Sequence, residues 1–378
     1  MTHASILIQI RAIELPLGEP LPWDLVDKRG ILVLRQGTLV TREEQVERLL
    51  ERRVCRARTA ADIEATSVVR PHASVFEQLS DLKGDLRDCL KAIALPGAGA
   101  SIEPLLAIAS RLRQLAAKHP DALLGALQLD HDANYTSLHP LLVAVIGELV
   151  AGRLGFDEDQ RISLCCAALS SNLGMLELQE TLAHQAEALD ERQRRAVHDH
   201  PEQSFEMLRA LGVTDPTWLG IVLAHHERTD GSGYPHARVA PQLEQMTSII
   251  ALADNYAAMV LPREYRDGLH GQQAMREIFV QRRVQVAQEL VQQFVKELGV
   301  YPPGAFVVMK NGDHGVVIKR GARVTNAPVV SCFANAEQSP YPAPLIRDTS
   351  ESGAPGIAGI TAPQTLALAL PKLWGMER

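Results

Sequence analysis

Two adjacent histidines followed by a glycine-rich loop impose the strictest constraint on how this chain can fold. The string reads His225-His226-Glu227-Arg228-Thr229-Asp230-Gly231-Ser232-Gly233-Tyr234-Pro235. Neighbouring side chains point in different directions on a helix, so both imidazoles can serve one metal ion only near a helix end or a kink. The glycines allow backbone to approach a ligand where a side chain would clash. The string therefore predicts a metal-binding histidine pair at the end of a helix.

The composition indicates a cytoplasmic globular protein with two or three domains. The chain has 378 residues, of which 46% are apolar, so it can bury a substantial core. Its formal net charge of −7 argues against a nucleic-acid polymer or a membrane surface as partner. The five cysteines show no CxxC spacing, which favours buried thiols in a reducing compartment. We expect no apolar run as long as a membrane span and no signal peptide.

Residues 1–64 are expected to form a small α+β module. Isoleucines alternate with other residues over 6–10, which predicts a first strand, and the apolar run at 31–34 predicts another. Thr41 and Glu44 have the spacing of a capping box, which opens a helix with one apolar face.

Helices are expected through most of the next part of the chain. Residues 65–128 are typical of a helical connector with a break at 95–100, and 129–298 of a helical domain. Apolar residues recur at helical spacing over 284–298, which predicts one stripe packed against a core.

The pattern changes after Tyr301-Pro302-Pro303-Gly304. Residues 299–346 predict a β extension, whose first two strands flank the hairpin signal Asn311-Gly312. Residues 347–378, rich in Ala, Gly and Pro, are expected to form a loosely ordered tail.

The string at 225–235 closely resembles the signature of the HD-GYP family, bacterial phosphodiesterases of cyclic di-GMP, and the resemblance extends over residues 130–346. It implies a mainly α fold: an HD-type helical bundle with a small α+β N-terminal module and a C-terminal β extension. It also implies a divalent metal (iron, manganese or zinc) and cyclic di-GMP as ligand. The family uses the loop surface for contacts with partner proteins, and here that loop comprises Asp230, Gly231, Gly233, Tyr234 and Pro235.

The family's motifs place its metal ligands on separate helices of one bundle. Matched motif by motif, the ligand positions in this chain are His139, His200, His225, His226 and Asp254. Ser204 stands where the family's HPxxG motif has glycine. Arg263 and Arg266 resemble a segment that contacts substrate phosphates, a task that suits the planar guanidinium fork. The plainer interpretation is surface arginines near a helix start.

The chain departs from the family at the His-Asp pair that gives the family its name. Residues 167–175 read AALSSNLGM, where the family has a string like AALLHDIGK. Ser171 replaces the histidine, Asn172 the metal-bridging aspartate, and Met175 the lysine beside the scissile phosphate. Asn172 keeps an oxygen but loses the charge that holds two cations together, and Met175 cannot stabilise phosphate charge.

These substitutions predict an uneven site with at most one metal ion, held by His200, His225 and His226. The first functional hypothesis is an inactive or weak relative of the phosphodiesterases that works as a cyclic di-GMP sensor or a protein-interaction module. A residual metal-dependent phosphodiesterase is the second. A structural scaffold that binds neither nucleotide nor metal is the third.

Overall fold

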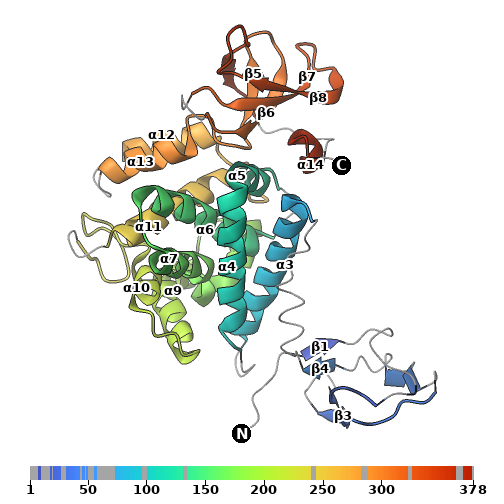
Figure 1. Ribbon diagram of the computed structural model, residues 1–378. Helices are drawn as coiled ribbons and strands as arrows, with labels where there is room; N and C mark the ends of the chain where they lie inside the picture. The colour runs from blue at the N-terminus through green and yellow to red at the C-terminus, as the bar shows by residue number, and fades with distance from the viewer. Residues whose placement is uncertain are drawn as a thin grey trace. The chain divides into compact units, whose positions relative to one another are not determined.

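Two compact units make up the chain: Met1–Pro71 with Pro96–Ala100, and His72–Leu95 with Ser101–Arg378 (Figure 1). In this computed structural model the described residues are 7–9, 18, 20–26, 31–42, 45–46, 48–49, 55–57, 73–95, 100–130, 134–239, 244–281, 288–321, 326–362 and 369–376.

The first unit contains a four-stranded antiparallel sheet in the order β1-β4-β2-β3. Its strands are β1 (Leu7–Gln9), β2 (Leu25–Val26), β3 (Leu32–Leu34) and β4 (Cys55–Ala57). The strands predicted near 6–10 and 31–34 are therefore confirmed. A buried cluster of Leu21, Leu25, Val40 and Leu49 packs in the same unit.

Residues 45–46 and 48–49 are helical, close to the helix start predicted at Thr41. The amides of Thr41 and Arg42 donate to Gln45 Oε1 at 3.0 and 3.1 Å. Glu44, the predicted capping residue, lies outside the described residues. Val46 packs against the buried cluster beside Leu49, so the predicted apolar face of this helix does face a core.

The second unit is a helical bundle, which confirms the predicted mainly α fold. Its helices before the sheet are α3 (Val75–Ala94), α4 (Glu103–Lys118), α5 (Pro120–Leu129), α6 (Tyr135–Leu154), α7 (Glu158–Ser170), η2 (Leu173–Met175), α8 (Leu176–His184), α9 (Glu191–Ala210), α10 (Pro216–Ala224), α11 (Gln245–Val260), α12 (Gly271–Gln281) and α13 (Gln288–Leu298). The predicted apolar stripe is confirmed in α13, whose Leu290, Val291, Phe294 and Leu298 are buried. Val284 and Ala287 of that stripe lie outside the described residues.

Helix α6 is the centre of the bundle and contacts α3, α4, α5, α7, α8, α11 and α13. The predicted boundary between connector and helical domain falls inside this packing and stays a prediction. By length and composition α6 could cross a membrane, since it has 20 residues and a mean hydropathy of 1.4. The expectation that no run approaches a span was therefore wrong for this helix. Neighbouring helices bury 78% of its apolar stretch, as in a core helix.

A buried ionic cluster ties α4, α6 and α7 together. Glu148 on α6 accepts from Arg113 Nε at 2.9 Å and also from Arg161. Arg113 makes a further bond to Glu158 Oε1 at 2.7 Å. The Glu148 side chain is 4% exposed and that of Glu158 is 77% exposed, so the same arginine has one buried and one solvated partner.

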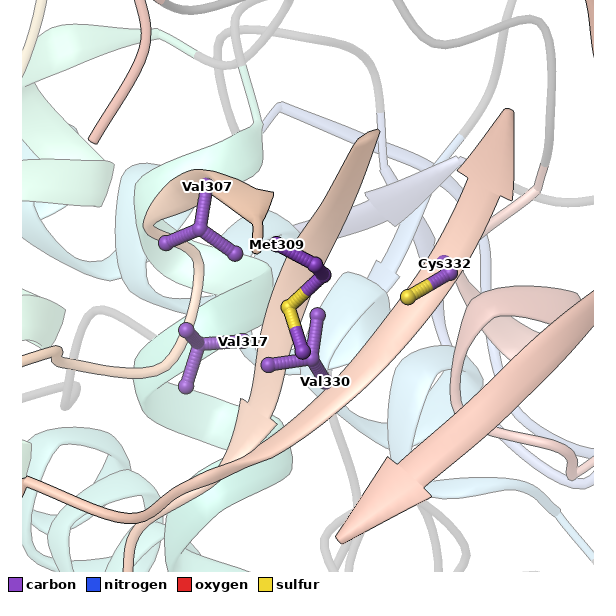
Figure 2. Packing of buried hydrophobic residues seen from close by; sticks show 5 residues of the cluster. All are labelled: Val307, Met309, Val317, Val330 and Cys332. Carbon is purple, nitrogen blue, oxygen red and sulfur yellow. The ribbon is translucent and has the colours of Figure 1, made fainter. Parts of the chain in front are cut away.

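A five-stranded antiparallel sheet in the order β8-β7-β6-β5-β9 follows the helices, next to α5 and α13 (Figure 1). Its strands are β5 (Phe306–Met309), β6 (His314–Lys319), β7 (Val329–Ala334), β8 (Pro340–Asp348) and β9 (Ile357–Ile360). The Asn311-Gly312 hairpin is confirmed, with Gly312 at φ 90°. Figure 2 shows the sheet's core: Val307, Met309, Val317, Val330 and Cys332. The cysteines whose side chains the structure describes are buried thiols, as expected: Cys89, Cys165, Cys166 and Cys332.

The described parts of the segment 347–378 are more ordered than the tail expected from its composition. Strand β9 pairs with β5, placing Ile360 opposite Val307, and α14 (Leu370–Leu373) follows. Trp374 Nε1 then donates to the Ile318 carbonyl at 3.0 Å. The expectation was wrong because β9 needs only two apolar side chains to join the core, too few to stand out in an Ala- and Gly-rich stretch.

Exchanging the buried partner of Arg113 should cost far more stability than exchanging its exposed partner. Glu148→Gln removes the buried carboxylate that Arg113 and Arg161 share, so we expect the free energy of unfolding to fall by about 3–5 kcal/mol. Glu158→Gln is the matched control and should change it much less, because water screens that pair. Urea unfolding of both variants measures the difference, and equal losses would contradict the importance of burial.

Candidate metal and ligand site

A cavity of about 500 Å³ lies among the helices that carry the predicted site residues. The predicted residues on its wall are His139, Asn172, Met175, His225, His226, Tyr234, Asp254 and Arg263. His200 is fully buried and reaches the site through its contact with His225. The structure thus brings together residues from α6, α9, α11, the turn after α7 and the loop after α10.

Backbone carbonyls fix the orientation of two histidines. Pro201 follows His200 inside α9 and has no N–H, so the Val197 carbonyl lacks its helical donor. His200 Nδ1 takes that place and donates to Val197 at 2.6 Å. His225 stands at the end of α10, where carbonyls also lack helical donors, and its Nδ1 donates to Val222 at 2.7 Å. The predicted helix end at the histidine pair is confirmed.

These two bonds leave the Nε2 atoms facing each other. Because Nδ1 carries the proton in each ring, a neutral ring presents a lone pair at Nε2. The two Nε2 atoms are 3.2 Å apart, and His226 completes a cluster whose ligand atoms lie within 4.8 Å of one another. Two lone pairs at that distance repel unless a cation or proton lies between them. The donor set therefore fits one divalent transition metal.

The imidazoles in this region are held in the form that binds metals. Burial, and then repulsion from His225, lowers the pKa of His200 to about 3. Burial also lowers the pKa of His225. Burial and the charge of Arg263 lower the pKa of His139 to about 4. All three rings are therefore neutral near pH 7, as metal ligation requires.

His139 and Asp254 form a second, smaller group on the cavity wall. His139 Nε2 lies 3.5 Å from Asp254 Oδ1, a separation like that of two neighbouring ligands of one cation with bonds of about 2.1 Å. His139 Nδ1, unlike that of His200 or His225, has no partner among the described residues. His139 therefore lacks the kind of Nδ1 hydrogen bond that fixes the ring orientation of His200 and His225.

The turn after α7 carries the replaced residues. Asn172 is 8% exposed, and its Oδ1 has no partner among the described residues. Ser171 faces inward, and its hydroxyl is 3.4 Å from the Ala168 carbonyl. Met175 lines the cavity. The turn thus presents one unpaired amide oxygen and one thioether where the family has an aspartate and a lysine.

Ser204 connects that turn to the histidine helix α9. Its hydroxyl donates to the Ser171 carbonyl at 2.8 Å and accepts from the Gly174 amide at 2.9 Å. A Cβ at Gly174 would lie 2.7 Å from the His200 carbonyl oxygen, so the two backbones are in direct contact. The serine that replaces the family's glycine therefore binds the turn that has lost the His-Asp pair.

Glu227 organises the glycine-rich loop. Its two carboxylate oxygens accept from the amides of His236 at 2.7 Å and Arg238 at 2.9 Å. A Cβ at Gly233 would lie 2.4 Å from the Arg228 amide nitrogen, which explains the glycine at that position. Glu227 is thereby committed to the loop backbone.

The other predicted residues of this loop build its turn and its contact with the histidines. Asp230 Oδ1 accepts from the Ser232 amide at 2.9 Å, and Gly231 has φ 77°. Tyr234, followed by Pro235 through a cis peptide, stacks on His226 with ring centroids 4.7 Å apart. The loop therefore lies against the metal cluster.

Of the two predicted phosphate-contacting arginines, Arg263 lines the cavity and Arg266 does not. Arg263 Nη1 donates to Tyr265 at 2.9 Å, and its guanidinium lies 5.3 Å from the centre of the Tyr135 ring. Its Nε is buried without a partner among the described residues. Arg266 instead donates to the Ala258 carbonyl at 2.7 Å. One arginine is thus available to an anion in the cavity.

Gln179 and Pro201 contribute to the site in ways that the sequence motifs did not predict. Gln179 lies on α8, four residues after the cap residue Met175, and both line the cavity. The proline after His200 signals a carbonyl that needs a donor. The helical spacing and the His-Pro pair were readable signals for these features.

Removing the Ser204 hydroxyl should destabilise the protein. Ser204→Ala leaves the Gly174 amide and the Ser171 carbonyl without their partner, so we expect a loss of about 1–3 kcal/mol in the free energy of unfolding. Ser110→Ala, at an exposed position of α4, is the control and should have little effect. Chemical unfolding of both variants measures this, and unchanged stability of Ser204→Ala would contradict the proposed connection.

Similarity to known proteins agrees with this architecture. Residues 108–286 match the family model described as HD domain. A solved HDG"Y"P protein from Bdellovibrio bacteriovorus superposes with a TM-score of 0.51, covering 76% of this chain and 98% of that chain at 15% identity. That likeness concerns the fold.

Two curated relatives are named cyclic dinucleotide phosphodiesterases. A cyclic di-GMP phosphodiesterase of Pseudomonas aeruginosa is 27% identical over 227 residues, which are 60% of this chain and 54% of the relative. A 3'3'-cGAMP-specific phosphodiesterase of Vibrio cholerae is 34% identical over 138 residues, 36% of this chain and 30% of the relative. The matches thus span about half or less of these relatives. With its HD domain, its fold and its His-His…Gly-Tyr-Pro string, the chain belongs to the HD-GYP family.

Proposed function

We propose that this protein is a cytoplasmic cyclic di-GMP receptor of the HD-GYP family with impaired phosphodiesterase activity. The observation that carries the proposal is the replacement of the family's His-Asp pair by Ser171 and Asn172, while the cavity remains. The names of the relatives support a cyclic dinucleotide as ligand. Arg263 offers a guanidinium for a phosphate in the cavity.

One divalent ion is the metal content that the donor set supports. His200, His225 and His226 would hold it, and a bound cation would supply Lewis acidity toward a phosphate oxygen. Asp254 is the remaining carboxylate at the predicted ligand positions, and Asn172 contributes no charge. A close pair of dications needs anionic ligands to offset their repulsion, and this site has lost the bridging one.

Turnover should suffer more than ligand binding. An amide at position 172 cannot bridge two cations, so a hydroxide between them is not formed efficiently. A thioether at position 175 offers no charge to the phosphate in the transition state. Together these losses correspond to several orders of magnitude in rate.

A residual one-metal phosphodiesterase is the second candidate, favoured by the intact three-histidine cluster. A scaffold without ligands would leave the cavity and its unpaired polar atoms unexplained. Signalling through the glycine-rich loop would place a protein partner against the surface of Tyr234 and Pro235. That surface lies beside His226, so a partner could sense whether the cavity is occupied.

We expect purified protein to contain one tightly bound divalent ion per chain. His225→Ala removes an oriented Nε2 from the cluster, so its metal content should fall well below that of the wild type. His184→Ala is the control, since the His184 side chain is 72% exposed and pairs with Glu264. Elemental analysis of the three proteins is the measurement. Two or three tightly bound ions, or unchanged content in His225→Ala, would contradict the single-ion site.

Wild-type protein should hydrolyse cyclic di-GMP very slowly or not at all. The variant Ser171→His, Asn172→Asp, Met175→Lys restores the bridging carboxylate and the cation, so it should load more metal and gain activity. Single reversions should do little, because residues that act as one catalytic unit are not additive. The assay is anaerobic incubation with manganese or iron, followed by quantification of linear product.

Direct titration with cyclic di-GMP completes this test. Binding without turnover supports the receptor, and robust multiple turnover by the wild type would return the chain to the enzymes. Absence of binding would favour the scaffold.

A further inference from the structure

One face of α8 forms a continuous part of the cavity wall. Gln179, Leu182 and Ala183 of α8 line the cavity, and their spacing of three and one residues places them on one side of the helix; Met175, the residue just before α8, lines the cavity as well. Three of the four side chains are apolar. This face is therefore suited to the flat, weakly polar surface of a nucleobase, with Gln179 as its polar group.

Gln179 is poised for a ligand. The residue is 8% exposed, and its Oε1 has no hydrogen-bond partner among the described residues. Buried polar atoms are normally satisfied, so an unpaired amide oxygen on a cavity wall indicates a missing donor. Asn172 Oδ1, on the same wall, is buried and unpaired in the same way. The Gln179 oxygen calls for an N–H group from whatever occupies the cavity, whereas the Asn172 oxygen stands at a predicted metal-ligand position.

Gln185 is a glutamine of the same cavity wall whose side-chain oxygen does have a hydrogen-bond partner within the protein. It lines the same cavity, but its Oε1 accepts from Gln193 Nε2 at 2.7 Å. Its Nε2 in turn donates to Gln193 Oε1 at 3.1 Å and to the Glu187 carbonyl at 3.2 Å. The amide of Gln185 is thus used within the protein, whereas the Gln179 oxygen is not.

The phosphate and the base of a nucleotide differ in charge and hydrogen-bonding groups, and this difference predicts its orientation in the cavity. Unpaired amide oxygens repel phosphate oxygens, so the phosphate belongs with the Arg263 guanidinium and not with α8. A base that meets Gln179 Oε1 must present a donor there. Guanine carries two neighbouring donors, N1–H and the N2 amino group, on its Watson–Crick edge, whereas adenine carries one amino group flanked by acceptors.

We propose that α8 forms a guanine subsite in which Met175 and Leu182 cover the face of the base and Gln179 Oε1 accepts from its Watson–Crick edge. This proposal rests on the proposed function, because it assumes a cyclic dinucleotide in the cavity. The proposal also gives a role to Met175, which stands where the family has lysine, since a polarizable thioether packs well on an aromatic ring. Gln179 then selects guanine over adenine.

Calorimetric titration of the metal-loaded full chain tests the subsite with cyclic di-GMP and cyclic di-AMP. The wild type should prefer cyclic di-GMP. Gln179→Leu should weaken cyclic di-GMP binding about tenfold or more, roughly 1.4 kcal/mol, while changing cyclic di-AMP binding little. Gln185→Leu, which removes an already paired amide, should keep the preference for guanine. Gln179→Met, closer in shape to glutamine, should repeat the loss if Gln179→Leu folds poorly.

The outcomes separate this inference from the proposed function. A wild type that binds neither dinucleotide overturns both. A wild type that binds cyclic di-GMP, with unchanged affinity in the folded Gln179 variant, overturns the subsite and leaves the receptor standing. Equal affinity of the wild type for the two dinucleotides also overturns the subsite, without any variant. Preference for guanine that is lost with Gln179 alone supports it.

Discussion

The Nδ1–H groups of His200 and His225 each donate to a carbonyl three residues earlier, and the geometry of the site follows from these two bonds. Each carbonyl is available for a local reason: the proline after His200 removes a helical donor, and α10 ends beside His225. The rings therefore cannot rotate without leaving a buried carbonyl unpaired. Their Nε2 lone pairs are fixed 3.2 Å apart, so the cluster is ready for a cation before one arrives.

The turn after α7 differs from the family's motif in charge, and contacts within the protein hold it in place. Gly174 still permits direct contact with α9, and Ser204 adds two hydrogen bonds across that contact. The turn is thus held in place by protein groups and does not need a bridged pair of metals to position it. Asn172 lacks the negative charge of the family's aspartate, and Met175 lacks the positive charge of the family's lysine. The wall keeps hydrogen-bonding capacity and apolar surface, which serve recognition better than phosphoryl chemistry.

Patterns that are local in sequence predicted most of the fold. Helical periodicity, the Asn311-Gly312 hairpin and the helix end at His225 depend on neighbouring residues, and all were confirmed. Features that depend on distant residues were not predictable. Ser204 looked like the loss of a glycine, because nothing in sequence shows that it meets the turn 30 residues earlier. Strand β9 was mistaken for tail because its partner β5 precedes it by some fifty residues.

Binding and turnover depend on different parts of this cavity. An enzyme accelerates a reaction only through contacts that are stronger in the transition state than in the bound substrate. The carboxylate bridge and the lysine are contacts of that kind, and both are replaced here. Contacts with the faces and edges of bases are about equally strong in both states, so they contribute affinity without rate. A site that keeps its contacts with the bases but loses the contacts specific to the transition state would bind its ligand and release it unchanged more often than it hydrolyses it. Under the proposed function, the replacements that should slow turnover would therefore favour a receptor, because a ligand that is not consumed can report its own concentration.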